Sequence, residues 1–167
     1  DDEQFIKFHG IYQQDDRDKR KTGKEYSVMV RTRQTGGIVP AAQYIVYDEL
    51  SGRFANGTLR ITSRQTFQFH GVLQQGIGPL IKSINDALSS TLATCGDVNR
   101  NVTAPSNPPV DHVAVQVDED AFAITRALLP TTTAYHSIWV DGVQVDLGLG
   151  DKVSKAAASA DQANPYM

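Results

Sequence analysis

Arg60-Ile61-Thr62-Ser63-Arg64-Gln65-Thr66-Phe67-Gln68-Phe69-His70 is the stretch whose pattern decides the expected fold. Alternate side chains of a strand point to opposite faces, so the stretch read as one strand separates into two chemically different sides. One side carries hydrogen-bond donors and fixed charge: Arg60, Thr62, Arg64, Thr66, Gln68 and His70. The other side can pack. A strand rises about 3.3 Å per residue, which places Arg60 and Arg64 roughly 13 Å apart and suits separate anionic groups on a large ligand.

Strands and helices are expected to alternate around this stretch. Residues 26–33 predict a strand, and residues 40–51 predict a helix that begins near Pro40 and is stopped by Gly52. The polar stretch belongs to a strand over 58–72, and apolar residues at helical spacing over 77–88 predict a second helix. This β-α-β-α order predicts an α+β fold in which helices back one face of a sheet and leave the opposite face available.

The flanking segments give weaker patterns. Residues 1–25 are expected to form a loop or extended arm, and 95–111 a loop with a short strand at 101–104. Asp118 or Asp120 is the expected cap of a third helix, which Pro130 closes. The remaining expectations are a hairpin of Tyr135–Val140 and Val143–Val145 around Asp141-Gly142, and a loosely ordered tail over 151–167.

Composition excludes several classes of function. The net charge of −3 gives no global field that would attract nucleic acid or an anionic membrane. No apolar run approaches the roughly 20 residues of a membrane-spanning helix, and no basic-then-apolar leader is seen. A cytoplasmic parent protein is the expectation, and an opening other than Met suggests a piece of a longer chain.

The arginines are the candidate functional residues. Arg31 and Arg33 share one face of the first predicted strand, and four guanidiniums would cluster if that strand neighbours the one carrying Arg60 and Arg64. Arginine suits such a site because its planar fork stays charged and binds carboxylates bidentately. Solvated arginines on an exposed sheet face explain the pattern equally well. Arg100, between two asparagines, fits either a turn or a ligand-binding role.

Three segments resemble the siroheme-dependent sulfite and nitrite reductases. They are Ile6-Lys7-Phe8-His9-Gly10-Ile11-Tyr12-Gln13-Gln14-Asp15-Asp16-Arg17-Asp18, Thr62-Ser63-Arg64-Gln65-Thr66-Phe67-Gln68-Phe69-His70-Gly71 and Asp97-Val98-Asn99-Arg100-Asn101-Val102. A weaker match follows over 128–141. The resemblance implies a ferredoxin-like half domain with an N-terminal arm over 1–94, the start of a siroheme and substrate domain over 95–150, and the tail. The first segment is more similar to the sulfite reductases than to the nitrite reductases.

The resemblance also implies roles for individual residues. By position, Arg31 and Arg100 match arginines near the bound sulfite and are the expected catalytic residues. The expected siroheme contacts are Arg60, Arg64, Gln68, His70 and Asn101. Cationic donors around an oxyanion would favour its binding and stabilise oxygen atoms as they are protonated.

Cysteine content sets a limit on this interpretation. The family binds a [4Fe-4S] cluster through four cysteines, whereas Cys95 is the only cysteine here and matches none of them. The chain is therefore expected to be the N-terminal part of such an enzyme and inactive alone, with no metal ligands of its own. Expected partners are the rest of the parent chain and an electron donor, either ferredoxin or an NADPH-linked flavoprotein. The isolated chain is expected to leave an apolar face open or to dimerise.

Two alternatives stay open. One is a nitrite reductase of the same family. The other is a non-catalytic module that binds a different polyacidic ligand or a protein partner through the same face. Nucleic-acid binding is disfavoured, because strand alternation places Phe67 and Phe69 on the face opposite the arginines.

Overall fold

The computed structural model describes residues 2–15, 21, 26–96, 98–130, 138–140 and 143–145. Within these ranges the chain begins with a short helix, α1 (Asp2–Phe8), and a strand, β1 (Ile11–Asp15). The prediction of a loop or extended arm for this region is therefore wrong for 2–15. Gly10 separates the two elements with a φ of +75°, a conformation that residues other than glycine rarely adopt.

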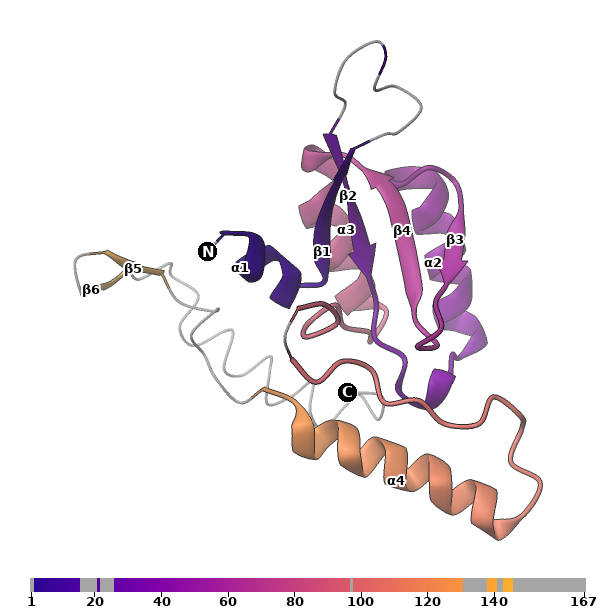
Figure 1. Ribbon diagram of the computed structural model, residues 1–167. Helices are drawn as coiled ribbons and strands as arrows, with labels where there is room; N and C mark the ends of the chain where they lie inside the picture. The colour runs from indigo at the N-terminus through magenta and orange to yellow at the C-terminus, as the bar shows by residue number, and fades with distance from the viewer. Residues whose placement is uncertain are drawn as a thin grey trace.

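A four-stranded antiparallel sheet forms the centre of the fold (Figure 1). After β1 come β2 (Tyr26–Arg31), β3 (Leu59–Ile61) and β4 (Phe67–Val72), in the spatial order β1-β2-β4-β3. The helix α2 (Ala41–Phe54) connects β2 to β3, which run in the same direction with β4 between them. This split β-α-β arrangement confirms the predicted α+β class and has the topology expected of a ferredoxin-like half domain.

The stretch from Arg60 to His70 is a hairpin and not one strand. The chain reverses between β3 and β4, where the backbone N–H of Thr62 donates to the carbonyl of Thr66 at 2.9 Å. The hydroxyl groups of these two threonines also bond at 2.7 Å, and Gln65 takes a positive φ of 56°. The expected 13 Å spacing of Arg60 and Arg64 along a single strand is wrong, because Arg60 lies on β3 and Arg64 lies in the turn.

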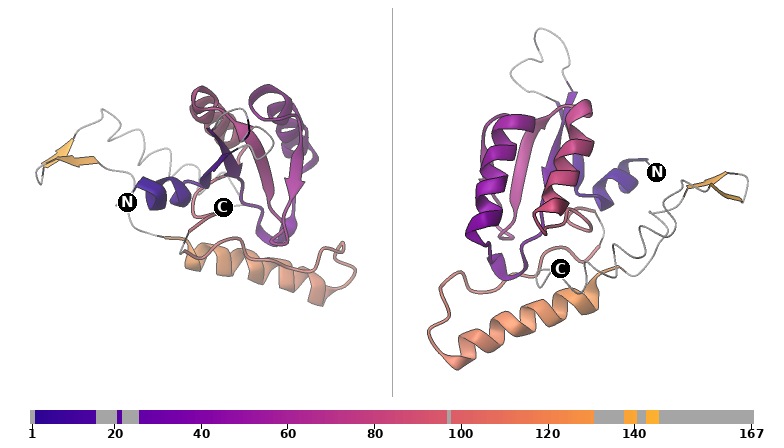
Figure 2. Two further views of the ribbon diagram at one scale, coloured as in Figure 1. Left: turned by 45° about the horizontal axis from the view of Figure 1, so that its top comes forward. Right: turned by 180° about the vertical axis from the view of Figure 1, so that it is seen from behind.

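The core lies between one face of the sheet and two helices, as the prediction of a helix-backed sheet required. Figure 2 (right), seen from behind, shows α2 and α3 (Gln74–Asp86) side by side in front of the strands, and both helices contribute buried side chains to one apolar cluster. The cluster contains Ile11, Val30, Tyr47, Leu50, Phe67, Phe69, Val72, Leu80 and Ile84. The opposite face of the sheet carries the alternate side chains of each strand and is covered by neither α2 nor α3 (Figure 1).

Two helix boundaries differ from those predicted. The helix α2 continues through Gly52 to Phe54, because Gly52 is exposed and its helical backbone needs no special conformation. The third helix, α4 (His112–Leu128), begins earlier than expected, at Asp111, whose carboxylate accepts the N–H of Ala114 at 2.8 Å. Asp118 and Asp120 therefore lie inside the helix and do not cap it.

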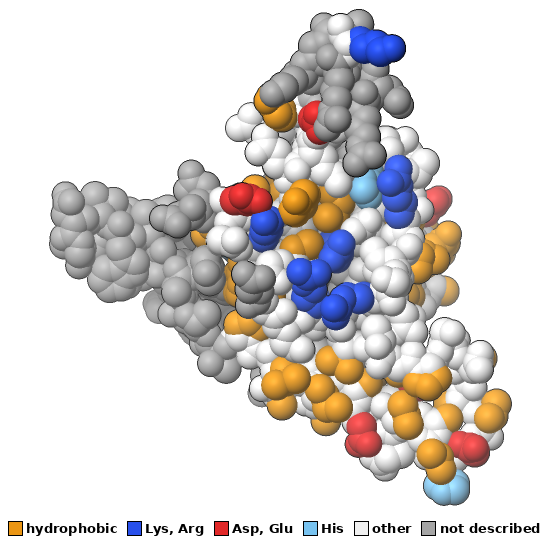
Figure 3. All heavy atoms as spheres, in the orientation of Figure 1, with side chains coloured by type: hydrophobic (Ala, Val, Ile, Leu, Met, Phe, Trp, Pro, Cys, Tyr) orange, Lys and Arg blue, Asp and Glu red, His pale blue; other side chains and the backbone are white. Residues whose placement is uncertain are grey.

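The helix α4 contacts the short 3₁₀ helix η2 (Thr35–Gly37), and Thr35 Oγ1 donates to Thr125 Oγ1 at 3.2 Å. Another side of α4 leaves apolar residues exposed: Val113, Val117, Ile124 and Leu128. Figure 3 shows hydrophobic side chains gathered over this helix. An open apolar face was expected of the isolated chain, whereas dimerisation stays a prediction.

The remaining expectations concern the second half of the chain. Residues 101–104 form no strand. The predicted hairpin is confirmed for β5 (Ile138–Val140) and β6 (Val143–Val145), which pair antiparallel. Its turn at 141–142 and the tail at 151–167 lie outside the described residues. The domain boundaries at 94 and 150 stay predictions.

Candidate functional site

A row of polar side chains crosses three strands on the open face of the sheet. Arg31 of β2 lies opposite Gln68 of β4, and Gln68 lies opposite Arg60 of β3. Residues directly opposite one another in neighbouring strands bring their side chains together on one face. Antiparallel pairing therefore places two arginines on either side of one glutamine, and blue side chains gather at the centre of this face in Figure 3.

Gln68 links this row to His70 through its amide. When the amide oxygen faces Arg31, it accepts from Nε at 3.1 Å and from Nη2, and the amide nitrogen donates to His70 Nε2 at 3.1 Å. His70 Nδ1 lies 3.0 Å from Oε1 of Gln14 on β1 and donates to it in the matching tautomer. Burial, reinforced by Arg60 and then Arg31, lowers the pKa of His70. The neutral imidazole is therefore favoured, and in this orientation the Gln68 amide oxygen, its nitrogen and both ring nitrogens of His70 have partners.

A pocket of about 440 Å³ lies beside the row. Its walls come from α1, the strands β1, β2 and β4, and the loop after α3, and three cationic side chains line it: Lys7, Arg31 and Arg100. None of the described residues that line it carries a carboxylate. The predicted catalytic pair thus lies around one pocket, although 69 positions separate its members (100 − 31).

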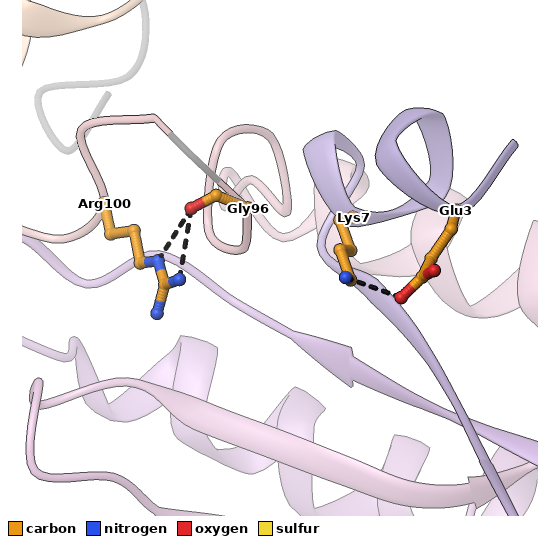
Figure 4. A network of polar contacts seen from close by, with 4 residues as sticks. All are labelled: Glu3, Lys7, Gly96 and Arg100. Atoms are coloured by element: carbon orange, nitrogen blue, oxygen red, sulfur yellow. Dashed lines mark hydrogen bonds and ion pairs between the residues drawn. The ribbon is translucent and has the colours of Figure 1, made fainter. Parts of the chain in front are cut away.

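The cations of the pocket are held by neighbouring groups (Figure 4). Arg100 donates to the carbonyl of Gly96 from Nε at 3.2 Å and from Nη2 at 3.1 Å. Lys7 pairs with Glu3 at 2.6 Å, and its ammonium lies 5.2 Å from the ring centre of Tyr12. Arg31 Nη1 donates to the carbonyl of Thr94 at 3.3 Å. A guanidinium has five N–H donors, so the bonds of Arg31 and Arg100 leave N–H groups of both side chains for another acceptor.

Gly10 brings α1 and β1 close to this loop. A Cβ at Gly10 would lie 2.4 Å from the Thr91 carbonyl oxygen and 2.5 Å from Thr94 Oγ1. The carbonyl of Gly10 also accepts the N–H of Arg31 at 2.9 Å. Gly10 therefore sits where the backbone of α1 and β1 approaches the loop after α3 too closely for any side chain.

The other candidate residues lie further from the pocket. Arg64 is exposed in the turn between β3 and β4. Asn101 is buried, and its Nδ2 donates to the carbonyls of Gln34 at 2.6 Å and Arg64 at 2.8 Å. Among the described residues Asn101 Oδ1 has no hydrogen-bond partner. The side chain of Asn101 therefore joins the loop that carries Arg100 to the turn that carries Arg64.

Arg33 does not join the cluster on the open face. The strand β2 ends at Arg31, and the Arg33 side chain is only 4% exposed beneath the loop at 92–100. The expectation of four guanidiniums on one sheet face is therefore wrong.

Lys7 and Gln14 are contributors that the sequence interpretation missed. Both lie in the first of the motifs quoted above, so the motif itself was the available signal. Their positions depend on α1 and β1, which composition alone did not predict.

In the described residues there is no group of His, Cys, Asp and Glu side chains able to hold a metal ion. A search of the same residues finds no helix with the length and apolar character needed to cross a membrane.

Comparisons with known proteins agree on one group of enzymes. Residues 18–87 match the nitrite/sulfite reductase ferredoxin-like half domain. Over 151 residues, 87% of this chain, it is 45% identical to the sulfite reductase [NADPH] hemoprotein beta-component of Staphylococcus haemolyticus and 47% identical to that of Anoxybacillus flavithermus. The corresponding Xanthomonas oryzae protein is 44% identical. The chain spans only 26% to 27% of these relatives.

A solved structure shares the fold. The NirA protein of Mycobacterium tuberculosis superposes with a TM-score of 0.60 over 78% of this chain and 26% of its own, at 23% sequence identity.

Proposed function

We propose, from the match of residues 18–87 to the nitrite/sulfite reductase ferredoxin-like half domain, that the open sheet face of this chain is one wall of a sulfite reductase site. The face would bind the carboxylates of siroheme and the sulfite anion. The observation that carries the proposal is the arrangement of Arg31, Gln68 and Arg60 in one row, with Arg100 across the adjoining pocket.

The donor set fits a polyanionic ligand. The described residues that line the pocket offer cationic and amide donors and no carboxylate, although Glu3 beside it pairs with Lys7 and the chain as a whole is acidic. Arginine and amide side chains on a rigid sheet keep fixed positions, so their N–H groups need little rearrangement when an anion binds. An exposed arginine row on a sheet would ordinarily be neutralised by carboxylates on neighbouring strands.

Each residue has a separate role in the proposal. Arg31 and Arg100 bind sulfite and stabilise negative charge on its oxygen atoms, and Lys7 adds a third positive charge to the pocket. Arg60, Arg64 and Gln68 donate to siroheme carboxylates, and His70, neutral before the ligand binds, accepts from the Gln68 amide and so orients it toward them. Asn101 serves the cofactor by holding the backbone of Arg64.

Siroheme, when bound, would supply the electrons that reduce sulfite to sulfide, coupled to a [4Fe-4S] cluster. The residues of this chain orient the anion and hold hydrogen bonds to it. The cluster ligands would come from the rest of a longer protein, because this chain has one cysteine. We propose a cytoplasmic enzyme that accepts electrons from an NADPH-linked flavoprotein or ferredoxin, and no activity for this chain by itself.

Siroheme titration of the purified chain tests the proposal. Wild-type protein should shift the Soret band of added siroheme, and Arg60→Met and Arg64→Met should each weaken siroheme binding about tenfold or more, since each removes a charged hydrogen-bond donor. Arg126→Met on α4 is the matched control, because Arg126 is exposed away from the sheet face. The absence of a wild-type shift, or equal weakening by all three substitutions, would contradict the proposal.

A further inference from the structure

Arg33 is the buried cation that the proposed site does not use. Its guanidinium donates from Nη2 to the carbonyl of Ala93 at 2.9 Å and from Nη1 to the carbonyl of Arg100 at 3.2 Å. Further bonds run from Nε and Nη2 to Leu92 and from Nη2 to Asn99. One planar fork therefore contacts both the beginning and the end of the loop at 92–100.

All of these acceptors are backbone carbonyls. Burial lowers the pKa of Arg33 to about 10, which leaves the side chain charged at neutral pH. A buried charge is tolerated where hydrogen bonds and dipoles surround it, and the carbonyl groups of the loop fill that role. The charge of Arg33 is thus stabilised by backbone carbonyl groups of the loop, and among the described residues no carboxylate pairs with it.

The loop that Arg33 holds is a wall of the cationic pocket. Cys95, Gly96 and Arg100 line the pocket, and the Gly96 carbonyl receives the Arg100 guanidinium. Arg31 is bonded to the same loop in two ways. Its Nη1 donates to the carbonyl of Thr94, and Thr94 Oγ1 donates to the Arg31 carbonyl at 3.1 Å. Both arginines of the anion pocket are therefore positioned against the segment that Arg33 spans.

We infer that Arg33 is a positioning residue for the anion site: it closes the loop at 92–100 and thereby fixes the guanidiniums of Arg31 and Arg100 for an oxyanion. The inference rests on the proposed function only in naming the anion. Holding the loop is a property of the chain itself and can be measured without a ligand.

Arg33→Lys is the informative substitution. Lysine keeps the positive charge, but its three N–H groups share one nitrogen and cannot reach carbonyls at both ends of the loop as the guanidinium fork does. Cys95 is the single cysteine of the chain and is buried in this loop, so its reaction with a thiol reagent reports loop opening. We expect Cys95 in Arg33→Lys to react about tenfold faster or more under native conditions.

A stability-matched control separates loop opening from general destabilisation. Leu50→Ala removes core packing on α2 and none of the hydrogen bonds of Arg33 to the loop. When its free energy of unfolding is equal to that of Arg33→Lys, Cys95 should still react slowly in Leu50→Ala. If Cys95 reacts equally fast in the two variants at matched stability, the inference is overturned. Should Arg33→Lys fail to fold, hydrogen exchange of the wild type decides: strong protection of the Ala93 N–H, which donates to Phe8, supports the inference, and nearly free exchange overturns it.

Sulfite titration followed by NMR tests the second half of the inference. Arg33→Lys should weaken sulfite binding about tenfold, and Arg126→Lys should leave it unchanged. If the wild-type chain shows no sulfite-dependent shifts, the proposed function loses its support, whereas Cys95 reactivity still decides whether Arg33 holds the loop. Faster Cys95 reaction with unchanged sulfite affinity would overturn the positioning role.

Discussion

Gly10 is the residue at which substitution has the clearest steric outcome. Gly10→Ala would place a methyl group 2.4 Å from a carbonyl oxygen at a φ of +75°, and we expect it to lower the free energy of unfolding by about 2–4 kcal/mol. Gly52→Ala is the control, because Gly52 lies in α2 with nothing within 4 Å of the added Cβ, and it should stabilise by about 0.5–1 kcal/mol. Urea denaturation measures both, and equal effects would contradict the packing described for Gly10.

His70 gives the chain a dependence on pH. Its pKa is lowered below the ordinary value of about 6.5 in the folded chain, so between the two values the unfolded chain binds more protons. Stability should therefore fall as the pH drops through about 6.5, until the folded imidazole also titrates. NMR titration of His70 should give a midpoint below 6.5, and His70→Gln should flatten the stability profile in this range. A midpoint above 6.5 would contradict the network around Gln68.

Residue types predicted which side chains could bind an anion, but not which ones face the site. Arg31 and Arg100 lie around one pocket as expected, whereas Arg33, of identical chemistry and two positions from Arg31, is buried. The difference arises because β2 ends at Arg31 and strand alternation no longer applies beyond it. Burial of Arg33 depends on carbonyl groups roughly 60 positions away, which no local pattern reveals.

At the scale of elements, Asp111 is the residue that starts α4. Asp111→Ala should remove the bond to the Ala114 N–H and lower the stability of the helix by about 1 kcal/mol, whereas Asp111→Asn should be nearly neutral because asparagine caps helices equally well. Asp118→Ala, at a cap position suggested by sequence, should not reproduce the loss. Thermal unfolding followed by circular dichroism distinguishes these outcomes.

The hairpin of β3 and β4 shows why a period-two pattern can mislead. Burial alternates along Phe67–His70 of β4, whereas Ile61 of β3 is exposed, and the turn contains neither glycine nor proline to mark it. Gln65 adopts the positive φ that such turns need, and its side chain exchanges two hydrogen bonds with the backbone of Ala104, at 2.6 and 3.1 Å. The support for this turn thus comes from a distant loop, beyond the reach of a local prediction.

At the scale of the whole molecule, charge and apolar surface are distributed unevenly. A net charge of −3 coexists with a cationic pocket, because the described acidic side chains lie elsewhere, on α1, α2, α3 and α4 among other places. The class of fold followed from the order of elements and the core from their apolar faces. The antiparallel order with β4 between β2 and β3 could not be predicted from the sequence. Alternation shows which side chains share a face of a strand, but it does not show which strands pair with one another.

That strand order also bears on how the chain folds. The β3–β4 hairpin joins residues close in sequence and can form early, but pairing of β2 with β4 must enclose all of α2 and the hairpin itself. Arg31 and Gln68 therefore come into contact only when β2 pairs with β4. The chain entropy lost in closing this long loop must be spent before the contact contributes any stabilising free energy. The proposed anion-binding row has no local precursor, so we expect a partly folded chain to bind no anion there before β2 has paired with β4.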